Sequence, residues 1–130
     1  MLDTTESVEI VDPVLLIRIT RLYRDDMTAE ELYDATRAAW VLGRRREDAE
    51  YALAVFGGIV REVYSIDSWH PGGTTLAISG IHDAHGPRDP DRWEFIGKVA
   101  PERVRSRYIG CSVSEYLPKG LRNPVTYVNC

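Results

Sequence analysis

The chain has little of several features that would fix its chemistry. Of its 130 residues only two are cysteines, Cys111 and Cys130, and only two are lysines. No apolar run approaches the roughly 20 residues that a membrane-spanning helix needs. The acidic N-terminus, MLDTTESVEIVD, lacks the basic and apolar regions of a signal peptide. We therefore expect a cytoplasmic protein without a membrane partner, whose cysteines stay reduced as thiols.

Motifs for phosphate transfer and hydrolysis are also missing. The sequence has no Walker loop, no GxGxxG and no G-x-S-x-G, which argues against nucleotide hydrolysis, dinucleotide redox chemistry and α/β-hydrolase chemistry. No histidine stands near Cys111 in the sequence, and a free cysteine is usually a small core residue. We therefore predict no catalytic residue and no cofactor, and we favour a protein that is not an enzyme.

Charge is distributed unevenly along the chain. The formal net charge of −4 argues against a strong non-specific grip on nucleic acid. Residues 1–34 hold nine acidic residues and three arginines, whereas residues 98–130 hold six basic residues and two acidic ones. Arginine, with 14 copies, supplies nearly all of the positive charge, and its planar fork suits carboxylates, phosphates and base edges. The pattern predicts a polarised surface.

The length and local patterns predict one globular domain at 13–130 after a loose leader at 1–12. The apolar run Val14–Thr20 predicts a strand that is covered on both faces. Thr28 and Glu31 have capping-box spacing, so a helix should begin there and end near Gly43. The run Tyr51–Trp69 is typical of extended chain, in which Gly57-Gly58 either forms a hairpin turn, with or without a bulge, or bends one long strand.

Shorter elements fill the rest of the chain. Strands are expected at Thr75–Ser79, Arg92–Lys98 and Val125–Val128, and short helices after Pro101 and after Ser112. Strands outnumber helices without β-α-β alternation. The sequence therefore predicts an α+β domain: a small curled mixed β-sheet or pseudo-barrel with one main N-terminal helix and short helices near the C-terminus.

Two groups of residues offer metal chemistry, and we favour neither. His82 and His85, with Asp83 and Asp89, lie in a glycine-flanked loop that supplies too few ligands of suitable spacing for zinc. Asp91, Glu94 and Lys98 are similar to the carboxylates and lysine of metal-dependent nucleases, but their spacing is wrong. We therefore predict no metal ligand and keep a small metal-dependent hydrolase or nuclease as the least favoured alternative.

Aromatic residues interleaved with arginines are the better lead. Proteins that hold unstacked or flipped bases use aromatic faces for stacking and arginine or asparagine for phosphates and base edges. Large aromatic residues in a small barrel also serve as core. The tryptophan that precedes the loop HPGGTT, Trp69, is the aromatic residue that we most expect to be exposed.

The pattern AVFGGIVREVYSIDSW, followed by RWEFIG, resembles the PUA-like superfamily, which includes the EVE, ASCH and YTH-type domains. The resemblance covers about residues 50–98 and implies a curled β-barrel that binds RNA or modified bases; the net acidity departs from it. The first hypothesis is therefore a non-catalytic domain that recognises nucleic acid or a modified nucleobase. The candidate residues are Trp69 and Trp93 for stacking, Arg44, Arg45, Arg46, Arg92 and Arg107 for phosphates, and Asn123 for a base edge.

The polarised charge supports a second hypothesis. Opposite charges at the two ends of a chain suit a structural or protein-interaction module, whose partner is a larger enzyme or another copy of the chain.

Overall fold

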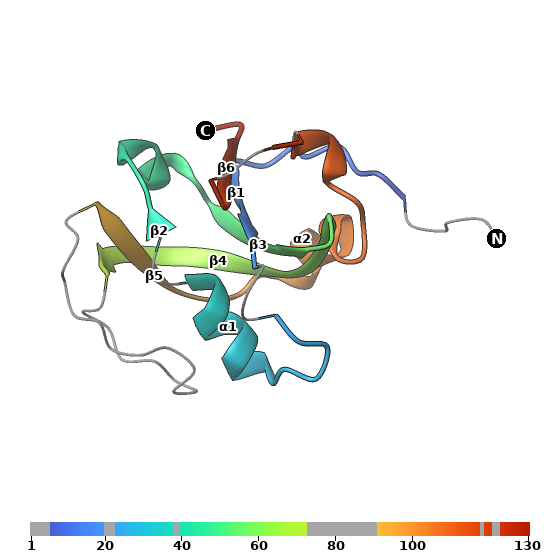
Figure 1. Ribbon diagram of the computed structural model, residues 1–130, viewed down its shortest axis with the longest axis horizontal. Helices are drawn as coiled ribbons and strands as arrows, with labels where there is room; N and C mark the ends of the chain where they lie inside the picture. Colours follow the sequence, from blue (N-terminus) through green and yellow to red (C-terminus); the bar gives the residue numbers. More distant parts are fainter. Residues whose placement is uncertain (1–5, 20–22, 38–39, 73–90, 118, 121–122) are drawn as a thin grey trace.

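The computed structural model describes residues 6–19, 23–37, 40–72, 91–117, 119–120 and 123–130. Six strands form one mixed, nearly closed sheet in the order β2-β5-β4-β3-β1-β6 (Figure 1). The strands are β1 (Val14–Arg18), β2 (Trp40–Val41), β3 (Tyr51–Phe56), β4 (Ile59–Pro71), β5 (Arg92–Val99) and β6 (Val125–Val128). The helices are α1 (Ala29–Arg37) and α2 (Glu102–Tyr108), and the short 3₁₀ helices are η1 (Arg44–Asp48) and η2 (Ser114–Tyr116).

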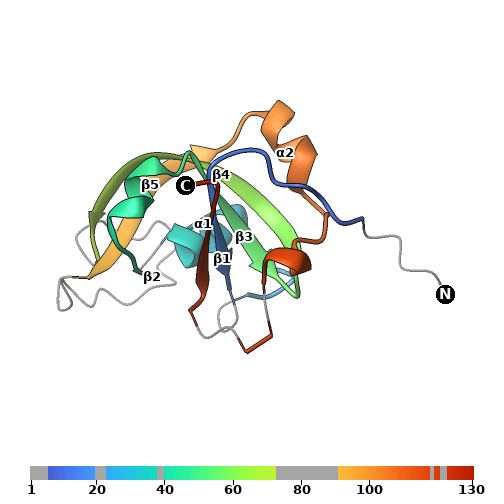
Figure 2. The ribbon, with the colours of Figure 1, turned by 90° about the horizontal axis from the view of Figure 1, so that it is seen from above.

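The sheet is mixed because β1 and β3 run parallel, whereas every other pair is antiparallel. Seen from above, the long strand β4 and its partner β5 curl away from β1 and β6 (Figure 2). The predicted α+β curled sheet or pseudo-barrel is therefore confirmed. In the described part of the chain, no helix has the length and apolarity needed to cross a membrane.

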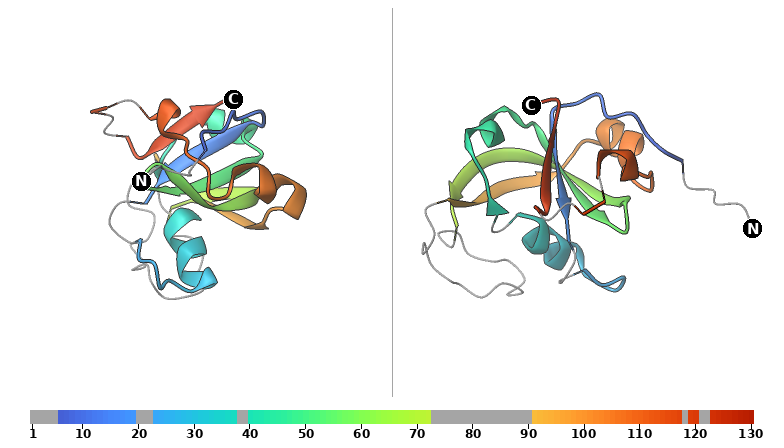
Figure 3. Two further views of the ribbon diagram at one scale, coloured as in Figure 1. Left: turned by 90° about the vertical axis from the view of Figure 1, so that its right-hand side faces the viewer. Right: turned by 45° about the horizontal axis from the view of Figure 1, so that its top comes forward.

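Both faces of the sheet are covered, as the apolar character of β1 predicted. Val14 and Leu16 belong to one buried cluster, while Leu15 and Ile17 belong to another. Successive side chains of a strand point to opposite faces, so the two clusters lie on opposite sides of β1. The first cluster includes Val104 and Tyr108 of α2, and the second includes Ala35 of α1. Figure 3 shows the two helices on different sides of the sheet.

Helix α1 begins with the predicted capping box. The Glu31 amide donates to Thr28 Oγ1 at 3.1 Å, and the Thr28 amide donates to Glu31 Oε1 at 2.9 Å. The bond from the Thr28 amide, together with Arg24, holds the pKa of the Glu31 carboxyl below its usual value. These reciprocal bonds satisfy amides that the first turn leaves without partners.

The predicted end of this helix near Gly43 was wrong. Helix α1 ends at Arg37, and Trp40–Val41 joins the sheet as β2, with Trp40 opposite Trp93. The Trp40 indole donates to the carbonyl of Thr36 at 2.7 Å, which satisfies a carbonyl in the last turn of the helix. Trp40 and Val41 have high strand propensity, and in the fold they pair with β5. The helical spacing in the sequence did not indicate this pairing.

Gly57-Gly58 forms a hairpin with a bulge, which was one of the alternatives left open. Both glycines have positive φ, 63° and 76°, as tight hairpin turns require. The register shifts between Ala54 and Val55, so that Val55 lies opposite Val60 and Leu53 opposite Val63. The bulge therefore avoids the pairing of Leu53 with Glu62 that an unbroken register would impose.

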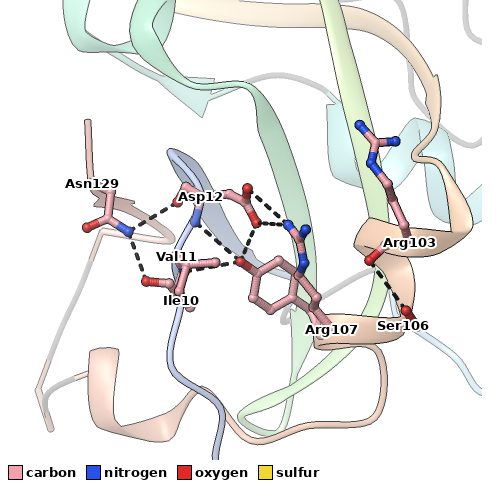
Figure 4. Close-up of polar contacts among 8 residues, drawn as sticks. Ile10, Val11, Asp12, Arg103, Ser106, Arg107 and Asn129 are labelled. Carbon is pink, nitrogen blue, oxygen red and sulfur yellow. Dashed lines mark hydrogen bonds and ion pairs between the residues drawn. The ribbon is translucent and has the colours of Figure 1, made fainter.

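Residues 6–12 of the predicted loose leader pack against the domain (Figure 4). Ile10 is buried, and its amide donates to the Tyr116 hydroxyl at 3.0 Å. The Tyr108 hydroxyl donates to the Asp12 carboxylate at 2.5 Å, and Arg107 donates to the same carboxylate. Asn129 donates to the carbonyls of Ile10 and Asp12.

The predicted strand Thr75–Ser79 and residues 1–5 lie outside the described residues.

Candidate functional site

The structure brings together three of the eight candidate residues. The guanidinium of Arg46 lies over the Trp93 ring, with its central carbon 3.5 Å from the ring centroid. The Trp69 indole donates to the Arg46 carbonyl at 3.1 Å. The Arg46 side chain is only 12% exposed, and both tryptophans are half-buried. These residues form an aromatic–arginine cluster in the wall of the domain.

Strand pairing explains why the tryptophans meet. Strands β4 and β5 pair antiparallel, with Trp69 opposite Phe95 and Pro71 opposite Trp93. The Trp69 and Phe95 rings meet edge to face, with centroids 5.6 Å apart. The Trp69 and Trp93 rings both pack against the cluster of buried residues that includes Phe95. Both tryptophans therefore contribute to the core and stay partly exposed, and Arg46 covers one face of Trp93.

The arginine triplet in η1 divides into different environments. The Arg45 guanidinium lies over the Tyr127 ring at 4.4 Å and donates from Nε to the carbonyl of Cys130 at 3.0 Å. Since Tyr127 is in β6 and Trp93 in β5, the Arg45 and Arg46 contacts join η1 to the end strand β6 and to β5, the neighbour of the other end strand. Cation–π contacts of this kind contribute roughly 0.5–2 kcal/mol each. Arg44 is exposed.

Arg92 lies next to this cluster at the start of β5. It is exposed, and its carbonyl accepts a hydrogen bond from the Gly72 amide at 2.8 Å. Arg92 precedes Trp93 in β5, and Arg44 precedes Arg46 by two residues in η1, so two exposed arginines adjoin the aromatic–arginine cluster along the chain.

The remaining two candidates lie elsewhere. Arg107, on α2, pairs with Asp12 at 2.9 Å. Asn123 precedes β6; its side-chain oxygen accepts from the Val125 amide, and its carbonyl accepts from Arg18. Figure 2 shows α2 at the far end of the sheet from η1 and β2. The structure therefore does not unite all eight residues in one site.

A buried group of charges was not predicted as a group. Asp34, Arg37 and Glu94 are each at most 3% exposed. Arg37 Nε lies 2.9 Å from Asp34 Oδ1, and Arg37 Nη1 lies 3.7 Å from Glu94 Oε2. The sequence signal was the spacing of three between Asp34 and Arg37, which puts them on one helix face. This group connects α1 to β5.

The nuclease-like residues Glu94 and Lys98 lie in different environments. Glu94 is buried beside Arg37, whereas Lys98 is exposed and lies 3.9 Å from Asp67. Among the residues that the structure describes, no three His, Cys, Asp or Glu side chains gather as a metal site. Residues His82, Asp83, His85 and Asp89 lie outside the described residues.

The two cysteines, Cys111 and Cys130, are free, partly buried thiols. Burial raises the pKa of the Cys130 thiol, which disfavours the nucleophilic thiolate.

A second aromatic surface, at the tip of the β3–β4 hairpin, was missed. Phe56 stacks on Tyr23, with centroids 4.5 Å apart and planes 22° apart. A cavity of about 380 Å³ lies beside Phe56, and one of about 330 Å³ lies beside Tyr23. In the sequence, only the position of Phe56 beside the glycine pair pointed to this surface. Tyr23 and Arg18 are distant from Phe56 in the sequence and approach it only in the folded chain.

Comparison of the chain with protein-family models, with curated proteins and with solved structures found no match.

Proposed function

We propose that this protein is a non-catalytic domain of PUA-like form that binds nucleic acid or a modified nucleobase. The observation that carries the proposal is the aromatic–arginine cluster of Arg46, Trp69 and Trp93, with the exposed residues Arg44 and Arg92 close to it along the chain. Half-exposed indoles offer apolar surface to bases, and the flanking guanidiniums attract phosphates.

The contacts within the aromatic–arginine cluster indicate a different role for Arg46 than for the exposed arginines. Arg46 covers one face of Trp93, so its main role is to hold that ring in place. The exposed guanidiniums of Arg44 and Arg92 meet phosphates. The formal net charge of −4 makes this local concentration of arginines necessary, because the molecule as a whole repels a polyanion.

Fluorescence anisotropy tests the proposal. Labelled eight-nucleotide RNA and DNA single strands, their duplexes and strands with one methylated base are titrated with protein at several salt concentrations. Affinity should fall with salt, with a logarithmic slope of about 0.7 for each phosphate contact on a single strand. Absence of binding to every oligonucleotide at low salt overturns the proposal.

Charge variants locate the surface. Arg44→Gln and Arg92→Gln should each weaken binding about three- to tenfold and lower the salt slope by about one contact. Arg103→Gln is the matched control, because Arg103 is exposed on α2, away from the cluster. Equal losses in all three variants would indicate a general charge effect and no binding surface at the cluster.

A protein-interaction module is the second candidate function. The uneven distribution of charge along the chain favours it, and Ile96 on β5, which is 40% exposed, offers an apolar side chain at which contact between copies can be tested. Light scattering of the parent and of Ile96→Asp distinguishes this candidate. A dimer that the substitution dissociates supports it, and a monomer in both samples excludes self-association through this surface.

A further inference from the structure

The tip of the β3–β4 hairpin exposes a stacked pair of aromatic rings. Phe56 is 36% exposed although it ends a strand of mostly buried residues. Its ring lies nearly parallel to that of Tyr23, with centroids 4.5 Å apart. An exposed phenylalanine held in this way keeps a defined orientation without being part of the core.

Arg61 supports the pair from the side. Its guanidinium carbon lies 5.3 Å from the Tyr23 centroid and 5.7 Å from the Phe56 centroid. The guanidinium carbon is almost equally far from the two ring centroids, which are themselves 4.5 Å apart. The guanidinium therefore lies beside the stacked pair. The guanidinium also donates to the Phe56 carbonyl from Nε and Nη2. Arg61 therefore fixes the pair and does not cover the outer face of the Phe56 ring.

The cavity beside Phe56 is open to solvent and has the volume of a small binding site. Its volume of about 380 Å³ is within the range of small-molecule pockets. Arg18 is the one charged residue of its lining. The other lining residues are Ile19, Val55, Phe56, Gly57, Gly58, Ser114 and Leu117. An apolar wall with an aromatic ring, a hydroxyl and a single positive charge suits a planar ligand that carries negative charge.

Arg18 also connects this cavity to Asn123, one of the candidate residues predicted from the sequence. Its Nη2 donates to the carbonyl of Asn123 at 2.9 Å. Asn123 is the residue predicted from the sequence to contact a base edge. Asn123 is exposed and does not line the cavity, which it adjoins only through this bond to Arg18.

We propose that this cavity holds one unstacked base of a single-stranded nucleic acid, with the base on the outer face of Phe56 and its phosphate toward Arg18. The inference rests on the proposed function and names its substrate class. A base within a duplex is stacked on both faces and cannot present one to Phe56, so the site selects single strands.

Affinity measurements with four variants test the proposal. The probe is a fluorescein-labelled strand of eight thymidylates, alone or annealed to its complement. Phe56→Ala and Phe56→Leu should weaken binding of the single strand about tenfold, because a stacked base contributes roughly that factor. Phe56→Trp should stay within about twofold of the parent. Val11→Ala is the matched control, since it removes an exposed apolar side chain that lies outside the hairpin.

Photo-crosslinking locates the contact independently of affinity. A strand with one 5-iodouracil is irradiated with the protein, and the crosslinked peptide is identified by mass spectrometry. We expect the crosslink at Phe56 and at least tenfold weaker binding of the duplex. The Leu and Trp variants keep apolar volume at the hairpin, so a folding defect of the Ala variant does not decide the result.

The outcomes separate the two proposals. Parent-like affinity in Phe56→Leu, or crosslinks only to the peptides of Trp69 or Trp93, overturns this inference and leaves the proposed function in place. No binding of any strand overturns both.

Discussion

At the residue scale, several arginines contact carboxylates and aromatic rings within the fold, so their side chains have a structural role. Arg37 is buried between two carboxylates, and Arg45 and Arg46 stack on aromatic rings. Arg105 bonds to Glu62 and Glu102, which raise the pKa of its guanidinium further. Because a planar guanidinium can donate and stack at once, it can close a small barrel as well as bind a phosphate. The arginine content alone therefore did not show which residues face a ligand.

Gly97 is a residue whose small size the fold requires. A Cβ atom there would lie 2.0 Å from the backbone oxygen of Ser65, which cannot move independently of β4. Its amide also donates to the Tyr33 hydroxyl at 2.9 Å. Gly97→Ala should lower the free energy of unfolding by about 3 kcal/mol or more, as overpacking against backbone does. The midpoint of urea unfolding measures this loss.

Gly43→Ala is the matched control. Nothing lies within 4 Å of its Cβ position, and its φ of −92° suits any residue. Stability should change by less than about 1 kcal/mol, in the stabilising direction, because alanine restricts the unfolded chain. Equal stability of the two variants would contradict the close approach of β4 and β5.

At the element scale, the buried charges Asp34, Arg37 and Glu94 determine how α1 sits on the sheet. The helix is only nine residues long, which is too short to be stable alone. Its packing against β3 and β5 and its buried ion pairs hold it in place. A capping box can start such a helix, but tertiary contacts decide where it ends.

Removing Arg37 tests this attachment. Arg37→Met keeps a similar volume but leaves two buried carboxylates without the guanidinium, which should cost about 3–5 kcal/mol. Urea unfolding measures the loss. Arg103→Met, at an exposed position, should change stability by less than about 0.5 kcal/mol. A parent-like midpoint for Arg37→Met would show that the ion pairs contribute little to stability.

At the scale of the whole molecule, burial of tyrosine hydroxyls makes the fold sensitive to alkali. Burial is the main cause that raises the pKa of Tyr64 and Tyr108 above the usual value of about 10. In the unfolded chain both phenols lose their protons near pH 10, while the folded state holds them. Their stabilising contribution is therefore complete below about pH 10 and declines as the pH rises toward the folded pKa.

A tyrosine variant should flatten this pH dependence. We expect the urea midpoint of the parent to fall between pH 9 and 11, and that of Tyr64→Phe to fall less over the same range. Phenylalanine keeps the buried ring and removes the ionisable hydroxyl. If both proteins lose stability equally, Tyr64 does not contribute to the alkaline transition.

The candidate site was only partly predictable. Trp69 and Trp93 were chosen as a pair, and β4–β5 pairing brings them to one cluster with Arg46. Arg107 was chosen for its charge, but its carboxylate partner, Asp12, lies 95 residues away in the sequence. Phe56 was passed over because its stacking partner, Tyr23, approaches it only in the folded chain.

The sequence by itself determined the features that depend on neighbouring residues. The capping box at Thr28 and the apolar run of β1 each follow from interactions within a few positions. Tertiary structure alone decided the bulge register of β3 and β4, the use of Trp40–Val41 as a strand and the contacts of each arginine. Those outcomes depend on partners distant in sequence, and local patterns carry no information about which partner will be near.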